Sequence, residues 1–135
     1  MISYSFSKNS AKKLETCCIE LQTLFKEVIK EMDCTIIEGT RPKWKQNLYF
    51  KQGKSKVKFP NGKHNKIPSD AVDVIPYIKG KGSWNVHHCC YFAGCVMSIA
   101  RKLDTKIRWG GNWDLDEEIM TDQDFQDLAH YEIRR

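Results

Sequence analysis

Two histidines and one aspartate in this sequence have the residue types and settings of metal ligands. His64 lies in a polar, turn-rich segment, Asp73 lies within the apolar run at residues 71–75, and His130 lies near the C-terminus in the run DLAHYEI. A carboxylate flanked by apolar residues is costly to desolvate unless a cation or a metal meets it. Two imidazoles and one carboxylate leave a coordination position open, which is typical of a catalytic zinc site rather than a structural one.

Three further side chains can complete a hydrolytic site around such a metal. Asp127 precedes His130 by three residues, and we expect it in a loop from which it reaches the same cleft without binding the metal. Hydrolysis of an amide needs a base for the proton of the attacking water, and Asp127 is the candidate by position. Arg41 precedes Pro42 after a strand end and can donate to a developing oxyanion, although a solvated surface arginine is an equal alternative. Glu132 shares a strand face with His130 and can orient its imidazole.

A rival metal site lies at the start of a predicted helix, in the run His87-His88-Cys89-Cys90. Both residue types bind zinc. However, a helix spreads four consecutive side chains over all its sides, and only His87 and Cys90 share a face. We therefore rank this cluster below the first site.

Short strands and two long helices must position the candidate residues. Apolar residues at three- and four-residue steps predict one helix over residues 8–32 and another over residues 86–103. Strands are predicted at 34–38, 71–75, 106–109 and 130–134, and a short helix is predicted at 44–50, ending at Gly53. In a strand over 71–75, Val72 and Val74 face one side while Asp73 faces the other. The strand at 130–134 likewise places His130 and Glu132 on one face.

The length and charge of the chain limit the number of domains and the kinds of partner that it can have. With 135 residues it is long enough for one domain with a real core, and its formal net charge is +5. A positive net charge favours an anionic partner: nucleic acid, a membrane surface or an acidic cell-wall polymer. No apolar run approaches the roughly 20 residues that span a bilayer. The N-terminus has no apolar signal segment, so we expect synthesis in the cytoplasm.

The six cysteines fit that compartment. Two adjacent pairs lie in helical patterns, where neighbouring side chains point to different sides and cannot form a good disulfide. No CxxC spacing is present. We expect reduced cysteines that serve as small apolar core residues.

Residues 51–66 are rich in lysine and have aromatic residues nearby. This composition resembles that of a single-strand nucleic-acid groove. No recognised nucleic-acid-binding motif accompanies it, which favours a solvated basic loop. Attraction to an anionic wall polymer is compatible with that interpretation.

The order His64, Asp73, Asp127-x-x-His130, with Arg41 on the loop after an early strand, resembles the zinc peptidases of the D-alanyl-D-alanine carboxypeptidase and VanX/VanY type. The chain is especially similar to the phage L-alanyl-D-glutamate endopeptidases, in the segments IIEGTRP, GKSKVKFPNGKHN, PSDAVDVIPY, WGGNWD and FQDLAHYEI. This resemblance spans essentially the whole chain. It implies zinc on His64, Asp73 and His130. It also implies that Asp127 is the general base and that Arg41 binds the substrate or transition state.

The same resemblance implies a fold and a function. The fold is α+β of the Hedgehog/D,D-peptidase type, with a small antiparallel sheet packed with helices in one catalytic domain over residues 1–135. No separate wall-binding domain is expected. The implied function is a monomeric zinc metallopeptidase that hydrolyses the L-Ala–D-Glu bond of peptidoglycan stem peptides in phage-type lysis, binding no nucleic acid and inserting into no membrane. Without a signal peptide, such an enzyme reaches the cell wall through a holin-type pore.

Two alternatives to this function stay open. The same residues can serve a D,D-carboxypeptidase that removes the terminal D-Ala of the stem peptide. The chain can also be a non-catalytic, metal-stabilised binding or virion protein. An intact Asp127 argues against the second alternative, because a structural metal site needs no base.

The sequence departs from the family pattern around its first histidine. The common pattern is S-x-H with a shorter spacing to the aspartate, whereas here Gly62 stands at the serine position and Asp73 follows His64 by nine residues. Ala129 also replaces a proline often found before the last histidine. The absent serine removes one possible substrate contact. We expect the longer loop to return His64 to the metal nonetheless.

Overall fold

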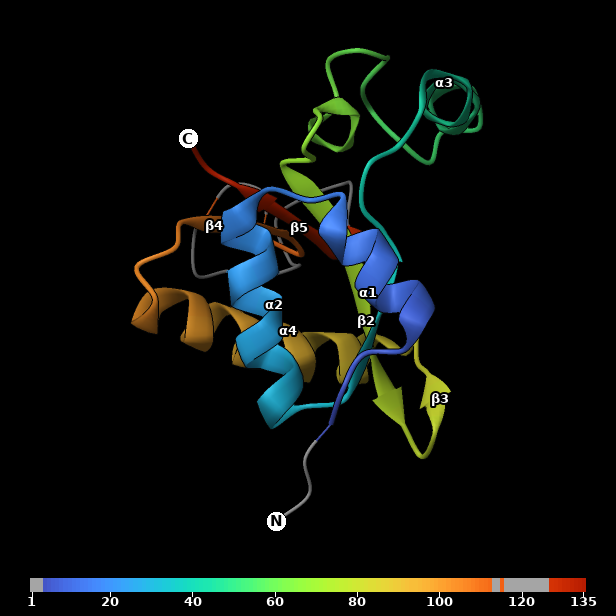
Figure 1. The fold of residues 1–135 in the computed structure, drawn as a ribbon. Helices are drawn as coiled ribbons and strands as arrows, with labels where there is room; N and C mark the ends of the chain where they lie inside the picture. The colour runs from blue at the N-terminus through green and yellow to red at the C-terminus, as the bar shows by residue number, and fades with distance from the viewer. Residues whose placement is uncertain (1–3, 113–114, 116–126) are drawn as a thin grey trace.

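A small antiparallel sheet forms the centre of the protein (Figure 1). The computed structural model describes residues 4–112, 115 and 127–135. Within them the strand order is β1-β2-β5-β4, and β3 pairs with the C-terminal end of β2. The strands are β1 (Cys34–Glu38), β2 (Ala71–Ile78), β3 (Lys81–Gly82), β4 (Ile107–Gly110) and β5 (Asp127–Ile133). The predicted α+β class is confirmed.

Helices α2 and α4 pack against the apolar face of this sheet (Figure 1). The helices are α1 (Lys8–Glu15), α2 (Ile19–Glu31), α3 (Lys43–Lys51) and α4 (Val86–Lys102), with a short 3₁₀ turn η1 (Lys63–Asn65). None of the helices among the described residues combines the length and apolar composition that crossing a membrane requires. Helix α3 and the loop after it lie apart from the main layers (Figure 1).

The alternation predicted for the strands is confirmed. Val72 and Val74 of β2 and Tyr131 of β5 are buried in the core beneath the helices. Asp73 and His130 occupy the intervening positions and therefore lie on the opposite face. The sheet thus separates an apolar core from a polar face that carries the candidate ligands.

The single helix predicted over residues 8–32 is wrong, because the chain forms two helices there. Between α1 and α2, the backbone N–H of Cys18 donates to the Ser69 carbonyl at 2.8 Å. The Ser69 N–H donates to the Thr16 carbonyl, also at 2.8 Å. These hydrogen bonds pair the chain with the segment just before β2 and replace the bonds of a continuous helix. The apolar period runs through the break, so the sequence pattern does not reveal it.

Asp127 lies in a strand and not in the loop predicted for it, because β5 begins at this residue. Gly110 pairs with Asp127 across an irregularity at the end of β4. A Cβ atom at Gly110 would overlap the Asp127 carbonyl, so the glycine permits the close backbone approach that extends the pairing. Of the predicted loop WGGNWD, Trp113 and Asp114 lie outside the described residues.

None of the six cysteines, all of which are among the described residues, forms a disulfide, as predicted. Four of them are buried, and burial raises the pKa of the Cys17 thiol to about 12. The buried cysteines therefore act as small apolar core residues. Cys90 and Cys95 of α4 are only partly buried, which the sequence did not distinguish.

Replacing Tyr131 by phenylalanine is expected to stabilise the protein. Tyr131 is fully buried between Phe25 and Phe92, and its hydroxyl has no hydrogen-bond partner among the described residues. A buried hydroxyl without a partner costs about 1 kcal/mol or more, so Tyr131→Phe should raise the thermal midpoint by about 3 °C. Tyr91→Phe, at a residue that is 75% exposed, is the matched control and should change nothing. A lower midpoint for Tyr131→Phe would show that the hydroxyl makes a stabilising contact.

Candidate metal centre and active site

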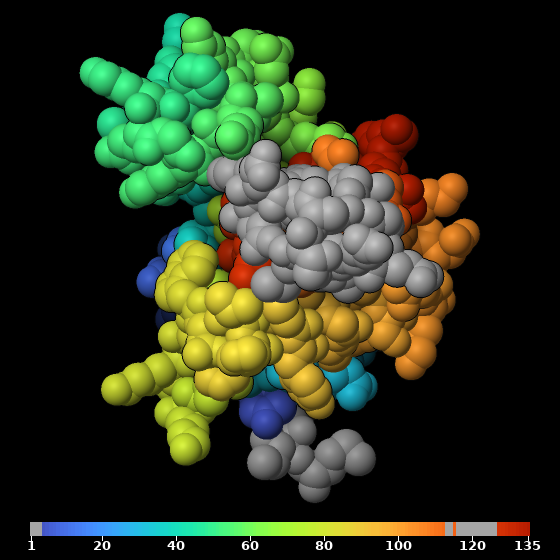
Figure 2. Space-filling view, turned by 180° about the vertical axis from the view of Figure 1, so that it is seen from behind, coloured from blue at the N-terminus to red at the C-terminus, as the bar shows by residue number. Residues whose placement is uncertain are grey.

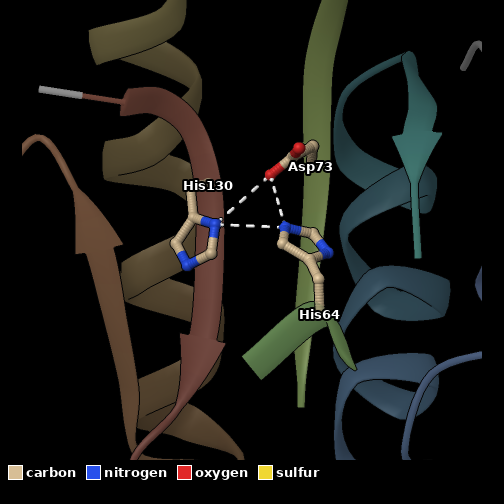
Figure 3. A group of neighbouring side chains, drawn as sticks. All are labelled: His64, Asp73 and His130. Atoms are coloured by element: carbon tan, nitrogen blue, oxygen red, sulfur yellow. Dashed lines mark hydrogen bonds and ion pairs between the residues drawn. The ribbon is translucent and has the colours of Figure 1, made fainter. Parts of the chain in front are cut away.

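Asp73 and His130 are brought together by strand pairing. They are directly opposed partners in the antiparallel pair of β2 and β5, so their side chains point to the same face of the sheet. His64 reaches the same point from η1, and the three side chains point toward one another (Figure 3). All three residues are buried.

The spacing of their facing atoms fits a metal. His64 Nε2 lies 3.1 Å from Asp73 Oδ1 and 3.2 Å from His130 Nδ1, and His130 Nδ1 lies 3.3 Å from Asp73 Oδ1. Tetrahedral zinc with bonds of about 2.0–2.1 Å holds its ligand atoms roughly 3.3 Å apart. Among the described residues no other group of three histidine, cysteine or acidic side chains could hold a metal ion. The donor set and its geometry therefore suit zinc.

The outer ring nitrogen of each histidine lies against an acceptor, which turns the other ring nitrogen toward the centre. His64 Nδ1 lies 2.7 Å from the Gly39 carbonyl, an acceptor, so Nδ1 carries the hydrogen and Nε2 is left to bind a metal. His130 Nε2 lies 2.8 Å from Glu132 Oε1, which leaves Nδ1 facing His64 and Asp73. Such outer partners fix the tautomer and orientation of a ligating imidazole.

Burial and neighbouring charges shift the pKa values of Asp73 and Glu132 downward and that of His130 upward. Burial alone would raise the pKa of Asp73, but His64 and His130 outweigh it and hold that pKa well below its usual range. Burial alone would lower the pKa of His130, but hydrogen bonds with Asp73 and Glu132 raise it to about 9. The pKa of Glu132 falls to about 2, because contacts with His130, Arg108 and Lys63 outweigh its burial. Without a metal, the site is thus an ion cluster with a proton on His130.

Zinc binding is expected to release that proton. With its pKa at about 9, His130 is protonated at neutral pH and must become neutral before Nδ1 can bind a metal. Zinc affinity should therefore weaken by about tenfold for each pH unit below that pKa. Calorimetric titrations in two buffers of different ionisation enthalpy count the released protons. An affinity that is constant between about pH 6 and about pH 8 would contradict this linkage.

Asp127 lies at the same site but outside the group of three candidate ligands. It is partly buried and lines a cavity of about 960 Å³ together with His64, Asp73 and His130. Burial and repulsion by Asp73 raise the pKa of Asp127, and the attraction of His130 and His64 only partly opposes this. A carboxyl group with a raised pKa can both accept and return a proton near neutral pH.

Arg41 is buried and held on several sides, so the solvated alternative considered for it is wrong. Its Nε donates to Glu38 Oε1 at 2.6 Å, its Nη1 to Gln46 Oε1 at 3.0 Å and its Nη2 to Asp73 Oδ2 at 3.4 Å. The guanidinium also lies 4.7 Å from the centre of the Tyr49 ring. Arg41 lines the cavity beside the three candidate ligands, and these hydrogen bonds fix the orientation of its guanidinium.

Glu38 and Gln46 support the site and were missed in the sequence. A bulge after Ile36 makes Glu38, rather than Ile37, the partner of Asp73 and thereby turns the Glu38 carboxylate toward Arg41. Gln46 is the one buried residue of α3. Its amide accepts from Arg41 and donates to the Val57 carbonyl at 2.7 Å. An acidic residue ending an apolar strand was the available signal for Glu38, whereas nothing in the pattern of α3 distinguishes Gln46.

Comparison with known proteins assigns the family. Residues 2–134 match the family model described as phage L-alanyl-D-glutamate peptidase. The chain belongs to this family. It is 34% identical over 115 residues to the L-alanyl-D-glutamate peptidase of Escherichia phage T5, an alignment that covers 83% of each protein.

A solved structure agrees with this assignment at the level of the fold. The crystal structure of the Serratia marcescens L-Ala D-Glu endopeptidase ChiX matches with a TM-score of 0.78, covering 97% of this chain and 91% of that one. The sequence identity is 20%, so this similarity concerns the fold. It confirms the peptidase-like architecture that the sequence predicted.

The departure from the family pattern at Gly62 has a local structural reason. The Gly62 N–H donates to Asn65 Oδ1 at 2.9 Å, and a Cβ atom at Gly62 would lie 2.6 Å from that oxygen. The amide of Asn65 also donates to the Arg41 carbonyl at 3.1 Å. A serine at position 62 would displace the Asn65 side chain, so the glycine permits this link between η1 and the Arg41 loop.

The rival cluster at the start of α4 does not form a comparable metal centre among the described residues. His88 Nδ1 lies 2.7 Å from the Ser83 hydroxyl, and the Cys89 thiol contacts the Ser83 carbonyl. His87 is exposed, while Cys89 is buried. His88 and Cys89 thus contact Ser83 just before the helix while His87 faces solvent, so these side chains do not converge, as the helical spacing predicted.

Proposed function

We propose that this protein is a zinc-dependent peptidase that cleaves the L-Ala–D-Glu bond of peptidoglycan stem peptides in phage-type host lysis. The observation that carries the proposal is the triangle of His64 Nε2, Asp73 Oδ1 and His130 Nδ1, with sides of 3.1–3.3 Å. Membership of the phage L-alanyl-D-glutamate peptidase family supports the choice of bond.

Asp127 is the proposed general base. When bound, a zinc ion supplies Lewis acidity, which polarises a carbonyl and lowers the pKa of water to about 7. Asp127 lines the cavity beside the three ligands and can take a proton from the attacking water and return it to the leaving nitrogen. Its raised pKa favours the first of these transfers, because a weaker acid is a stronger base and accepts the proton of the water more readily.

Arg41 and Glu132 have supporting roles in the proposed reaction. Arg41 is a fixed cation on the cavity wall and can stabilise the negative charge that develops on the carbonyl oxygen. Its contact with Asp73 Oδ2 also leaves Oδ1 directed at the two histidines. Glu132 accepts from His130 and is itself held by Arg108 Nη2 at 2.9 Å, so it orients the imidazole.

We further propose that the enzyme acts as a monomer and reaches the wall through a holin-type pore. Cleavage outside the cytoplasm requires such a route if the chain carries no signal segment. Family membership supports a role in phage lysis, since the T5 relative is a phage protein.

Mass spectrometry of soluble muropeptides incubated with the protein tests the proposed bond. The expected products are a fragment ending in L-Ala and a peptide beginning with D-Glu, and a zinc chelator should prevent their formation. Loss of the terminal D-Ala alone would make the protein a carboxypeptidase. Intact muropeptides with zinc-loaded protein would favour the non-catalytic alternative.

A further inference from the structure

The positive charge of this protein is concentrated in one projecting part of the fold. Residues 43–66, here called the lysine lobe, comprise α3, the following loop and η1, and they contain eight lysines and no acidic residue. The other 14 basic residues are outnumbered by the 17 acidic residues, all of which lie outside the lobe, so the rest of the chain has a formal charge of −3. The lobe therefore carries the whole positive excess.

The lysine lobe stands out from the body of the molecule and is well exposed. In Figure 2 its green atoms form a mass that projects beside the remaining surface. Six of its lysines are exposed: Lys43, Lys51, Lys54, Lys56, Lys58 and Lys66. Because the lobe has no acidic residue, none of these charges is neutralised from within it.

Apolar side chains accompany these charges at the surface. Trp44 and Leu48, one helical turn apart on α3, are 68% and 41% exposed. Lys54 Nζ lies 5.5 Å from the centre of the Tyr49 ring, and Lys58 Nζ lies 5.0 Å from that of Phe50. Tryptophan is enriched among the residues that dominate binding interfaces, so an exposed Trp44 among lysines suits a docking surface.

The lysine lobe is continuous with the cavity of the candidate active site. Lys45, Lys54 and Lys56 line that cavity together with His130 and Glu132. Gln46 joins the lobe to Arg41 by a hydrogen bond of 3.0 Å. A polymer held with one peptide in the cavity would therefore pass over the lobe.

We propose that the lysine lobe is a docking surface for the carboxylate-bearing peptide stems that neighbour the stem being cleaved. The inference rests on the proposed peptidoglycan substrate. Each D-Glu residue keeps one carboxylate when its other carboxyl group forms the peptide link, so the uncleaved polymer presents a repeated negative charge. A surface with six exposed lysines attracts such a polymer and raises its local concentration at the cavity.

Sedimentation of the full-length protein with purified, insoluble sacculi tests this docking directly. The test variant is Lys43→Gln, Lys51→Gln and Lys58→Gln combined, at exposed lobe positions. The matched control combines Lys12→Gln, Lys26→Gln and Lys102→Gln, at exposed positions of the other three helices, and has the same net charge. Binding is measured in the cold with a zinc chelator present, so that no substrate is consumed. Thermal midpoints without chelator check that both variants fold.

The lobe variant should bind sacculi roughly tenfold more weakly than the control, and the difference should shrink as salt is raised. Sacculi whose carboxyl groups have been chemically amidated should bind both variants equally weakly. Equal binding of the two variants to untreated sacculi would overturn the inference. So would a lobe-dependent affinity for phosphatidylglycerol vesicles that matches that for sacculi, since the partner would then be any anionic surface.

Failure of this inference and failure of the proposed function are distinguishable. A protein that docks through the lobe and cleaves no muropeptide would overturn the function and leave the docking surface. Cleavage of muropeptides by a protein whose lobe variant sediments like the control would overturn the docking surface and leave the function. For an active enzyme, the lobe substitutions should reduce cleavage of sacculi by roughly tenfold more than cleavage of a soluble muropeptide.

Discussion

Replacing Asp127 by asparagine should lower turnover by roughly 10²–10⁴-fold while zinc remains bound. The amide keeps the shape of the side chain and cannot accept a proton, so the change removes the proposed base alone. Because Asp127 lies beside the ligand triangle and outside it, the zinc content should stay at one ion per chain. Steady-state cleavage of a soluble muropeptide and elemental analysis of the same sample measure the two quantities.

Asp104→Asn is the matched control for this substitution. Asp104 is exposed, and asparagine tolerates its positive φ of 54°. Turnover of this control should equal that of the parent protein. Loss of zinc together with activity in Asp127→Asn would make Asp127 a ligand and overturn its assignment as base. Undiminished turnover in Asp127→Asn would show that Asp127 is not the general base.

Replacing His64 by alanine should abolish both zinc binding and turnover. The substitution removes one corner of a triangle whose sides are 3.1–3.3 Å, and only two protein ligands remain. Loss of an outer partner of a metal ligand already costs about 10–100-fold in affinity, so loss of the ligand itself should cost more. Competition with a zinc indicator measures the affinity, and muropeptide cleavage with stoichiometric zinc measures the activity.

The rival cluster supplies the control for this second prediction. His87→Ala combined with Cys90→Ala should leave zinc stoichiometry and affinity unchanged, because these residues join no group of three ligands among the described residues. Zinc loss in that double variant, with zinc retained in His64→Ala, would move the metal site to the start of α4.

The positions of the candidate ligands could be predicted because their chemistry conflicts with their local setting. A carboxylate within the apolar run of β2 needs a partner, and the period of two places Asp73 opposite to Val72 and Val74. The same period placed His130 and Glu132 on one face of β5. Only neighbouring residues in the chain are needed to place these side chains on their strand faces, and the structure has them on those faces.

Features that depend on distant partners could not be predicted in this way. The break between α1 and α2 follows from hydrogen bonds with Ser69, which no helical period encodes. The bulge that turns Glu38 toward Arg41 depends on the register of β1 against β2. Gln46 lies on a helix whose other residues are not buried, and its role arises only when Arg41 and Val57 meet it. The strand position of Asp127 likewise depends on its pairing with Gly110.

Titration of the metal-free protein with zinc, while cleavage at L-Ala–D-Glu is followed, tests the central claim most directly. With one zinc site per chain, we expect no cleavage without metal, a linear rise in rate up to one zinc per chain and a constant rate beyond it. Full cleavage by the metal-free protein, or a zinc-saturated protein that leaves the bond intact, would contradict the central claim.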